Sequence, residues 1–583
     1  MENQRLLLVI AISVVSLVLY TNWIEFSAPK KAPIAIENKS FPSVDPSSKT
    51  PVAPTVEAAK TPSKTTPGTA PDAPKETGMF RSGSDIKLTS KQRIKVRTDV
   101  LQVELDTLGA DIRQVDLIKY PVSVKKQAPA YRIMLDKSAN LYVAEASFAM
   151  PKEFADFAPH LLSEYTTAKL EYELTDEMRK NKQNLEVKFA WADKGVTVTK
   201  TYTFKPGKYD VDLLVSVENK SGKIWKGSFY RQLKRSQAGD SQSQNVFLPT
   251  YFGSALHSGK HGYEKVTLDD ISKDYIQNKR SDLEQQHGGW VAMLEQFFLG
   301  AWIPAKGDTN KFYSLFDAQK VFYTIGIQSP LVEIAQSKTH EFRSTLYIGP
   351  KTQDELAKLS PGLERSVDYG WLTILSEPLF WLLGWLHRLV GNWGWAIILL
   401  TLLIKMVFYK LSETSYRSMA KMKNIHPRLQ ALKDRFGTDR QGLHQAMMEL
   451  YRKEKINPLG GCLPILVQIP VFIALYYVLL ESVEIRQAPF IFWLRDLSIP
   501  DPWFVLPLLM GVTMLLQHKL NPAPLDPIQQ KVMMMMPIVF TVFFMFFPAG
   551  LVLYWVINNI LSIAQQAVIT KRITGKPIFA RDS

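Results

Sequence analysis

Apolar and polar residues alternate through much of residues 80–345, which is the pattern of strands that bury one face. Residues 196–204 alternate over nine positions, a Lys-Pro-Gly-Lys turn follows at 205–208, and residues 211–217 alternate again. Two alternating segments around such a turn predict a β-hairpin. Many segments of this kind in one stretch predict that residues 80–345 fold as a β-sandwich.

The pattern changes near residue 375, beyond which long apolar runs dominate. One run, residues 379–409, would be roughly 46 Å long as a single helix, too long for a hydrocarbon core of ~30 Å. His387, Arg388 and a Gly-Asn-Trp-Gly sequence interrupt this run. We therefore expect an interfacial helix over 379–389 and a membrane-spanning helix over 393–409. Further spans are expected over 463–480, 503–516, 532–547 and 551–569, of which the last two are joined by a Pro-Ala-Gly turn alone.

A shorter apolar run lies near the beginning of the chain. Residues 6–20 follow Arg5, and the small residues after them precede Pro29, which disfavours cleavage. We therefore expect an uncleaved membrane anchor. Residues 28–76 contain ten prolines among small and polar residues. Such a segment cannot bury enough apolar surface to fold, so the sequence predicts a semi-extended tether.

The charges of the loops predict the topology. Residues 410–457 carry eleven Lys and Arg, which places this loop in the cytoplasm. Residues 481–502 carry two Arg and four acidic residues and fall on the opposite side, while the C-terminal tail is basic again. Six spans with both termini in the cytoplasm satisfy these constraints, and the β domain then lies outside the cytoplasm, between the first two spans.

The predicted fold is a polytopic α-helical membrane protein with six transmembrane helices and a large extracytoplasmic β-sandwich. Loop 410–457 itself predicts two helices, over 412–436 and 441–455, that form a charged hairpin. The predicted parts are an anchor (1–27), a Pro-rich tether (28–79), the β domain (80–345), a connector with the interfacial helix (346–392), the second transmembrane helix (393–411), the cytoplasmic helical hairpin (412–457), transmembrane helices three to six (458–570) and a short basic tail (571–583).

Composition narrows the classes of function. The chain has 70 Lys and Arg against 55 Asp and Glu, a net charge of +15, but no nucleic-acid motif accompanies the excess. We attribute it to loops that face anionic lipid. A single cysteine, Cys462, excludes a disulfide within the chain. His257 and His261 are four residues apart without a third ligand, and residues 80–345 show no catalytic pairing of carboxylates, so we predict no enzyme, metal site or cofactor.

Lys405 is the most informative residue, because it lies inside a predicted span. A charge there costs at least ~2.5–3.5 kcal/mol, and the six predicted spans contain no acidic residue that could compensate it. Lys405 must therefore reach water, polar side chains or a visiting acidic group, unless it snorkels to the interface. Polar residues recur on the same helix faces in three spans: Thr401; Gln468; and Tyr554, Asn558, Ser562 and Gln565.

These polar residues predict a water-filled cavity that is open to the cytoplasm; the alternative is a dry core with hydrogen bonds between helices. Methionines offer a second signal, because their flexible side chains accept many apolar shapes. The alternative is ordinary lipid-facing filler. The candidate methionines for hydrophobic substrate contact are Met533, Met534, Met535, Met536 and Met545 in the spans, and Met419, Met422, Met447 and Met448 in the hairpin.

The apolar half of the chain contains several long, ordered motifs. They are Asn-Trp-Gly (392–394), Ser-Met-Ala-Lys-Met (418–422), Asn-Pro-Leu-Gly-Gly-Cys-Leu-Pro (457–464), Gln-Ile-Pro-Val-Phe (468–472), Ala-Leu-Tyr-Tyr (474–477) and Phe-Pro-Ala-Gly-Leu-Val-Leu-Tyr (547–554). These motifs resemble those of the YidC membrane protein insertases, and the resemblance covers the whole chain. It implies an extracytoplasmic β-supersandwich domain and a five-helix insertase core in the bacterial inner membrane. It also implies a groove in the inner leaflet with one cation that draws in the substrate's polar end.

By this resemblance Lys405 takes the place of the groove cation, which is usually arginine, and Thr401, Tyr554 and Trp555 fall on groove positions. The implied substrates are nascent inner-membrane proteins, inserted independently or together with the Sec translocon. The short C-terminal tail gives only weak support for a ribosome contact. The alternative functions are a transporter, which would normally need intramembrane acids, and a membrane-tethered carbohydrate-active enzyme, for which residues 80–345 show no catalytic pairing of carboxylates.

Overall fold

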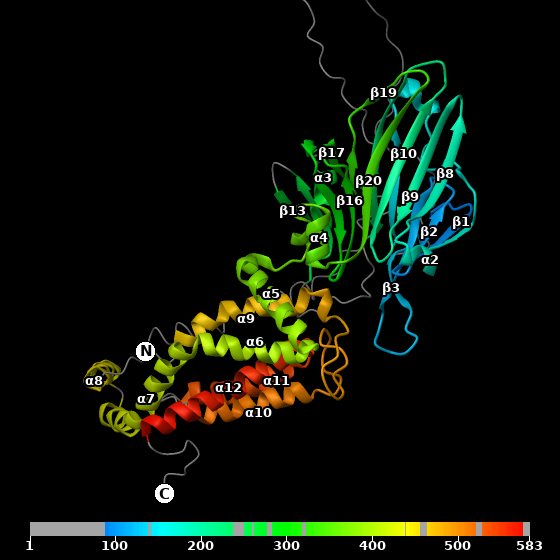
Figure 1. Cartoon of the computed structure of the whole chain (residues 1–583). Helices are drawn as coiled ribbons and strands as arrows, with labels where there is room; N and C mark the ends of the chain where they lie inside the picture. The colour runs from blue at the N-terminus through cyan, green and yellow to red at the C-terminus, as the bar shows by residue number, and fades with distance from the viewer. Residues whose placement is uncertain are drawn as a thin grey trace, which may run out of the picture. The chain divides into compact units, whose positions relative to one another are not determined.

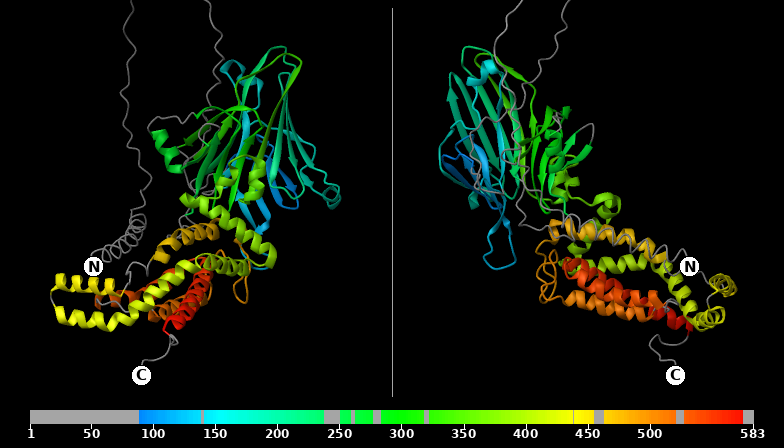
Figure 2. Two further views of the ribbon diagram at one scale, coloured as in Figure 1. Left: turned by 60° about the vertical axis from the view of Figure 1, so that its left-hand side comes forward. Right: turned by 180° about the vertical axis from the view of Figure 1, so that it is seen from behind.

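The computed structural model describes residues 88–137, 141–236, 250–258, 262–276, 283–317, 322–437, 439–454, 463–520 and 527–574. The predicted anchor and tether lie outside the described residues, as does the end of the tail. A large β-rich region comes first along the chain, and a helical region follows it (Figures 1 and 2).

The described strands form two sheets, of eleven and nine strands. The order in the first sheet is β14 (Leu283–His287), β17 (Thr309–Asp317), β18 (Phe322–Gln328), β11 (Trp225–Ser236), β5 (Tyr142–Ala149), β3 (Asp111–Pro121), β2 (Leu101–Asp106), β1 (Arg93–Arg97) and β7 (Glu171–Glu173), with β19 (Val332–Ile334) paired to β11 and β4 (Ala130–Met134) to β3. The order in the second is β13 (Gly262–Val266), β12 (Gly253–Ser258), β15 (Trp290–Leu294), β16 (Phe298–Pro304), β20 (Lys338–Pro350), β10 (Asp210–Asn219), β9 (Val196–Phe204), β8 (Leu185–Asp193) and β6 (Thr166–Thr167).

The predicted hairpin is confirmed: β9 and β10 pair antiparallel, with Phe204 opposite Val211. Alternate side chains of both sheets meet in one buried apolar cluster, for example Val96 of β1 and Val198 of β9. The alternation seen in the sequence thus marks the inner face of each sheet. Three short helices accompany the strands: α2 (Asp176–Lys180), α3 (Leu268–Ile276) and α4 (Gln353–Leu359).

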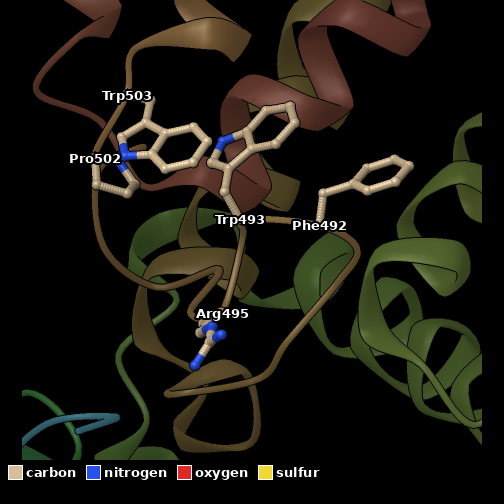
Figure 3. A pocket seen from close by; sticks show the side chains of 5 residues that line it. All are labelled: Phe492, Trp493, Arg495, Pro502 and Trp503. Carbon is tan, nitrogen blue, oxygen red and sulfur yellow. The ribbon is translucent and has the colours of Figure 1, made fainter.

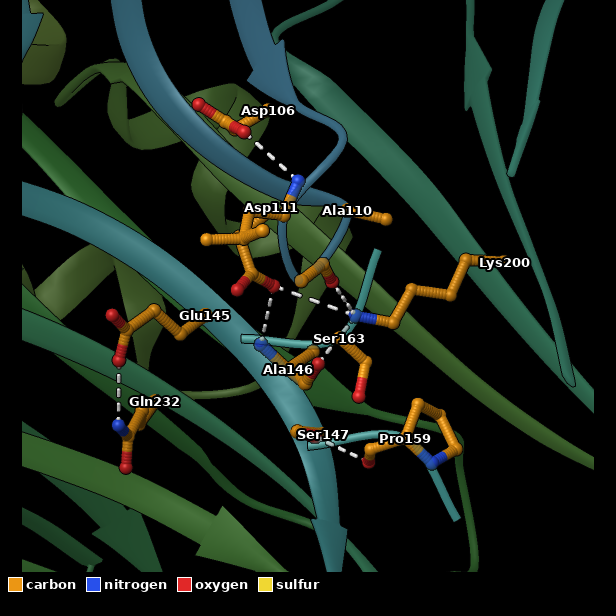
Figure 4. Close-up of polar contacts among 12 residues, drawn as sticks. Asp106, Ala110, Asp111, Glu145, Ala146, Ser147, Pro159, Ser163, Lys200 and Gln232 are labelled. Carbon is orange, nitrogen blue, oxygen red and sulfur yellow. Dashed lines mark hydrogen bonds and ion pairs between the residues drawn. The ribbon is translucent and has the colours of Figure 1, made fainter. Parts of the chain in front are cut away.

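The same alternation carries a lysine into the interior. Lys200 shares the inward face of β9 with its valines and is completely buried. Its Nζ donates to the carbonyl oxygens of Gly109 and Ala146, both at 2.5 Å, and lies 3.4 Å from Asp111 Oδ1 (Figure 4). Burial raises the pKa of Asp111 to about 6, against the opposing effects of Lys200 and Arg113. The core therefore contains an ion pair that the strand pattern alone does not reveal.

The helical region begins with α5 (Thr373–Val390), which is the predicted interfacial helix extended by one to two turns at its N-terminal end. Exposed Trp381 and Trp385 lie along it. Gly391 then ends the helix at φ 66°. The remaining helices are α6 (Trp393–Val407), α7 (Tyr409–Phe436), α8 (Arg440–Lys453), α9 (Leu463–Glu481), α10 (Val505–Leu520), α11 (Pro527–Phe544) and α12 (Ala549–Thr574).

Helix length does not settle the number of spans. Among the described residues, one helix, Ala549–Arg572, is long and apolar enough to cross a membrane by itself. A second candidate is the pair α6 and α7, which is bent by 68°. The apolar stretches of α9, α10 and α11 are shorter, at Val467–Glu481, Val505–Leu520 and Gln530–Phe544. Six spans therefore stay a prediction.

Asn392 joins α6 to the loop after α9. Its Oδ1 accepts a hydrogen bond from Trp395 N at 3.2 Å, while its Nδ2 donates to the carbonyl oxygens of Pro489 and Phe490 at 3.1 and 3.2 Å. Asn392→Ala should therefore lower the free energy of unfolding by about 1 kcal/mol or slightly more. Asn392→Ser keeps a capping hydroxyl and should lose less. Thermal unfolding of the purified protein measures both, and equal midpoints for the two variants would contradict the capping contribution.

Candidate functional site

Lys405 lies in the last turn of α6 and is 8% exposed. Its Nζ donates a hydrogen bond to Ser562 Oγ on α12 at 2.8 Å. The serine hydroxyl in turn donates to the carbonyl oxygen of Asn558 at 2.7 Å, so its acceptor side is the one that faces the lysine. No carboxylate pairs with Lys405 among the residues that the structure describes. The cation is thus held by a neutral partner inside the helical region.

A cavity of about 280 Å³ surrounds this contact, with room for several water molecules. Five helices contribute to it: α6, α7, α9, α10 and α12. Most of the lining side chains are polar, and the rings of Phe472 and Trp555 meet edge to face at 4.6 Å on one side. The lining residues are Lys405, Ser412, Ser415, Tyr416, Met419, Gln468, Ile469, Phe472, Met514, Gln517, Tyr554, Trp555, Asn558, Asn559 and Ser562.

The structure brings most of the predicted polar residues together, but two of them lie elsewhere. Thr401 is buried one turn before Lys405, and its Oγ1 donates to the carbonyl oxygen of Ile397 in the same helix at 2.7 Å. Gln565 donates from Nε2 to the carbonyl oxygen of Tyr409 at 3.5 Å and so lies at the start of α7. Neither residue is among those that line the cavity.

The candidate methionines separate into three groups. Met419 lines the cavity. Met422 and Met447 pack against Ile425 and Leu429 inside the hairpin, where they hold α7 and α8 together, and Met448 is 46% exposed on α8. Met533, Met534, Met535, Met536 and Met545 belong to the α11 segment and the turn after it, which contribute no residue to the cavity.

One wall of the cavity consists of residues that are not among the predicted ones. Ser412, Ser415, Tyr416 and Met419 occupy one face of α7, at the spacing i, i+3, i+4 and i+7. This spacing was readable in the sequence, but the loop charge had marked the segment as the start of a solvated hairpin. In the structure α7 begins at Tyr409, and its first turns are part of the cavity before the hairpin begins.

Comparisons with known proteins agree across the chain. Residues 93–382 match the family model described as the YidC periplasmic domain, and residues 385–576 match the one described as the 60Kd inner membrane protein. A relative named membrane protein insertase YidC from Nitrosococcus oceani is 44% identical over 580 residues, which is 98% of this chain and 99% of that protein. Another with the same name, from Thioalkalivibrio sulfidiphilus, is 50% identical over 490 residues, which is 83% of this chain and 85% of that protein.

A solved structure of an active YidC insertase is also similar, at 17% identity. It covers 82% of this chain and 93% of its own, with a TM-score of 0.37. A score this low adds nothing to the family match, which rests on the sequence relatives.

Proposed function

Because this chain belongs to the YidC family of membrane protein insertases, we propose that the cavity around Lys405 receives the polar or acidic end of a protein that is being inserted. The chain's function is the insertion of membrane proteins, and its substrates are nascent proteins of the inner membrane. The cavity around Lys405 is then the place in the molecule where the substrate's hydrophilic end is held during insertion.

The observation that carries the proposal is the environment of Lys405. The side chain is 8% exposed, its hydrogen-bond partner is a serine hydroxyl, and the described residues offer it no carboxylate. A cation without a counter-charge in a partly dehydrated site attracts an acidic group more strongly than an exposed lysine does. Water in the cavity and its polar lining would keep the site charged between substrates.

We propose the topology that the loop charges predict. The helical hairpin α7–α8 and both termini lie in the cytoplasm, the β domain lies in the periplasm, and six helices cross the inner membrane, the first of them at residues 6–20. The position of Lys405 at the hairpin end of α6 supports a cavity that opens toward the cytoplasm and the inner leaflet. The Sec translocon as a partner belongs to this proposal, and ribosome contact is the less supported addition.

A reconstituted system tests the role of the cavity. Liposomes that contain the purified full chain receive a single-span substrate whose translocated tail carries Asp and Glu, and protease-protected substrate is measured. A matched substrate has Asn and Gln at the same positions. We expect the acidic tail to be inserted more efficiently in the presence of the protein. Equal protein-dependent insertion of the two substrates would contradict a cavity that binds acidic groups. It would not contradict the insertase function itself.

The alternatives are less well supported. The insertase family is not an enzyme family, and in the described residues of the β domain the buried cations Lys200 and Lys234 pair with Asp111 and Glu145. We propose that this domain performs no sugar chemistry. The absence of intramembrane acids from the predicted spans likewise speaks against a proton-coupled or sodium-coupled transporter.

A further inference from the structure

A second pocket, of about 370 Å³, lies in the loop between α9 and α10 (Figure 3). Phe492, Trp493, Arg495, Pro502 and Trp503 line it. Three of the rings form a stacked row, with centroids 6.2 Å apart from Phe492 to Trp493 and 5.9 Å apart from Trp493 to Trp503. We call these three residues the aromatic row. Phe492 is 85% exposed and Trp503 is 67% exposed, which is unusual for rings of this size.

The loop holds the aromatic row in place through its two buried aspartates. Asp501 accepts hydrogen bonds from Trp493 Nε1 at 2.9 Å, from Trp503 N at 3.0 Å and from Leu506 N at 2.8 Å. Asp496 likewise accepts three bonds from neighbouring residues of the loop. The exposure of the rings is therefore a feature of an ordered loop, because the backbone and one indole are fixed by buried carboxylates.

Arg495 adds a positive charge to this surface. Its side chain is exposed, and no ion pair with it is found among the described residues. The two acids nearest in sequence are buried, and both already accept hydrogen bonds from loop donors. The surface thus combines stacked apolar rings with a guanidinium that is free to bind an anion. Guanidinium matches the geometry of a phosphate group through paired hydrogen bonds.

Contacts with neighbouring helices hold this loop beside the first residues of those helices. Gly550 N donates to the carbonyl oxygen of Leu497 at 2.9 Å, and Ala549 N donates to that of Ile499 at 2.8 Å, at the start of α12. The side chain of Asn392, at the start of α6, donates to the carbonyl oxygen of Phe490. Helix α10 begins at Val505, two residues after Trp503. The aromatic row therefore lies where three apolar helices begin, which is the level of the lipid headgroups in a membrane protein.

We infer that the aromatic row and Arg495 form a binding site for a phospholipid of the outer leaflet. The phosphodiester accepts hydrogen bonds from the Arg495 guanidinium, while the glycerol and the first methylenes of the acyl chains lie against the indole rings. A soluble anion would use the arginine but not the rings, whereas a lipid uses both. The inference rests on the membrane location of the helices and the proposed topology, and it does not depend on the cavity at Lys405.

Native mass spectrometry of the purified full chain, titrated with phosphatidylglycerol, tests the site. Arg495→Gln should weaken the tightest lipid-binding step about tenfold, since a charge-assisted hydrogen bond to phosphate is lost. The double variant Phe492→Ala/Trp503→Ala should weaken it similarly. Trp493 is left unchanged because its indole holds Asp501. Arg97→Gln, which removes an exposed arginine of β1, is the matched control and should leave lipid binding unchanged.

Inorganic phosphate separates the two possible sources of the anion. When phosphate is present at about a 10-fold molar excess over lipid, the site should still bind phosphatidylglycerol. Displacement of the lipid by phosphate would overturn the inference in favour of a soluble-anion site. Equal lipid binding by Arg495→Gln and Arg97→Gln would also overturn it, as would unchanged binding in the double aromatic variant. Circular dichroism of each variant checks that the fold is intact before binding is compared.

Discussion

Lys405→Glu is expected to cause the largest loss of insertion of any single substitution in the cavity, about a hundredfold for a substrate with an acidic tail. Two unit charges ~5 Å apart at an effective dielectric of ~20 interact by roughly 3 kcal/mol, and water in the cavity reduces this. Lys405→Ala, which only removes the attraction, should therefore cost about tenfold. Replacement by glutamate turns attraction into repulsion and should roughly double the free-energy cost. Protease-protected insertion into liposomes measures each variant.

Two further variants separate charge from structure. Lys405→Arg should insert within about twofold of the wild type, because a cavity of about 280 Å³ accommodates a guanidinium and the charge is kept. Ser562→Ala removes the hydrogen-bond partner of the lysine but leaves the charge, so its effect should be smaller than that of Lys405→Ala. A silent Lys405→Ala would show that the lysine only snorkels. Equal losses for acidic and neutral tails would assign it to the hydration or stability of the helices.

Lys200→Met is expected to destabilise the β domain by about 3–5 kcal/mol near pH 8, because it leaves Asp111 as a buried charge without its partner. The carbonyl oxygens of Gly109 and Ala146 also lose their donor. Pulse proteolysis of the full chain in urea reports unfolding of this domain. The matched control is Lys188→Met on the adjacent strand, whose exposed side chain pairs with Glu186 and should contribute less than about 1 kcal/mol.

The deficit should shrink as the pH falls. Burial already raises the pKa of Asp111 from 3.8 to about 6 in the wild type, and loss of the lysine should raise it further. A carboxyl group with a raised pKa contributes stability that is present below its unfolded pKa and is lost as the pH rises through its folded pKa. The variant should therefore recover part of its stability between about pH 8 and pH 5, and Asp111→Asn should restore part of it at pH 8. A deficit that is independent of pH would contradict this account.

How far the sequence predicts the structure depends on how local the signal is. The β9–β10 hairpin follows from alternation within single segments, and the helices from α5 to α12 follow from the length and composition of single apolar or charged runs. Lys405 was found because a charge in an apolar run is conspicuous. Lys200 was readable in part, since it has the same parity as Val196 and Val198 along β9. Its partners Asp111 and Ala146 come from the other sheet and Gly109 from the turn between β2 and β3, and no pattern within one strand identifies them.

Some residues of the cavity are likewise not identified by the pattern of a single segment. Loop charge indicated which side of the membrane the hairpin faces, but charge says nothing about where the helix begins. For that reason Ser412, Ser415 and Tyr416 were assigned to the hairpin although they line the cavity. Thr401 shares a helix face with Lys405, which predicts a place in the cavity, but it is buried outside the lining and its hydroxyl donates within α6. A shared helix face predicts which way a side chain points. Whether that side chain reaches the cavity depends on how the helices pack.

The continuity of α7 has a mechanical consequence. One helix carries the cavity wall in its first turns and, further along, the residues that pack against α8, with Pro427 as its only internal proline and lying beyond the wall. The stretch of α7 before Pro427 contains both the cavity wall and two of the residues that pack inside the hairpin, Met422 and Ile425. A rotation of this stretch about the 68° bend at the start of α7 would therefore move the wall and the base of the hairpin together. A partner that binds the hairpin could in this way change the width of the cavity around Lys405.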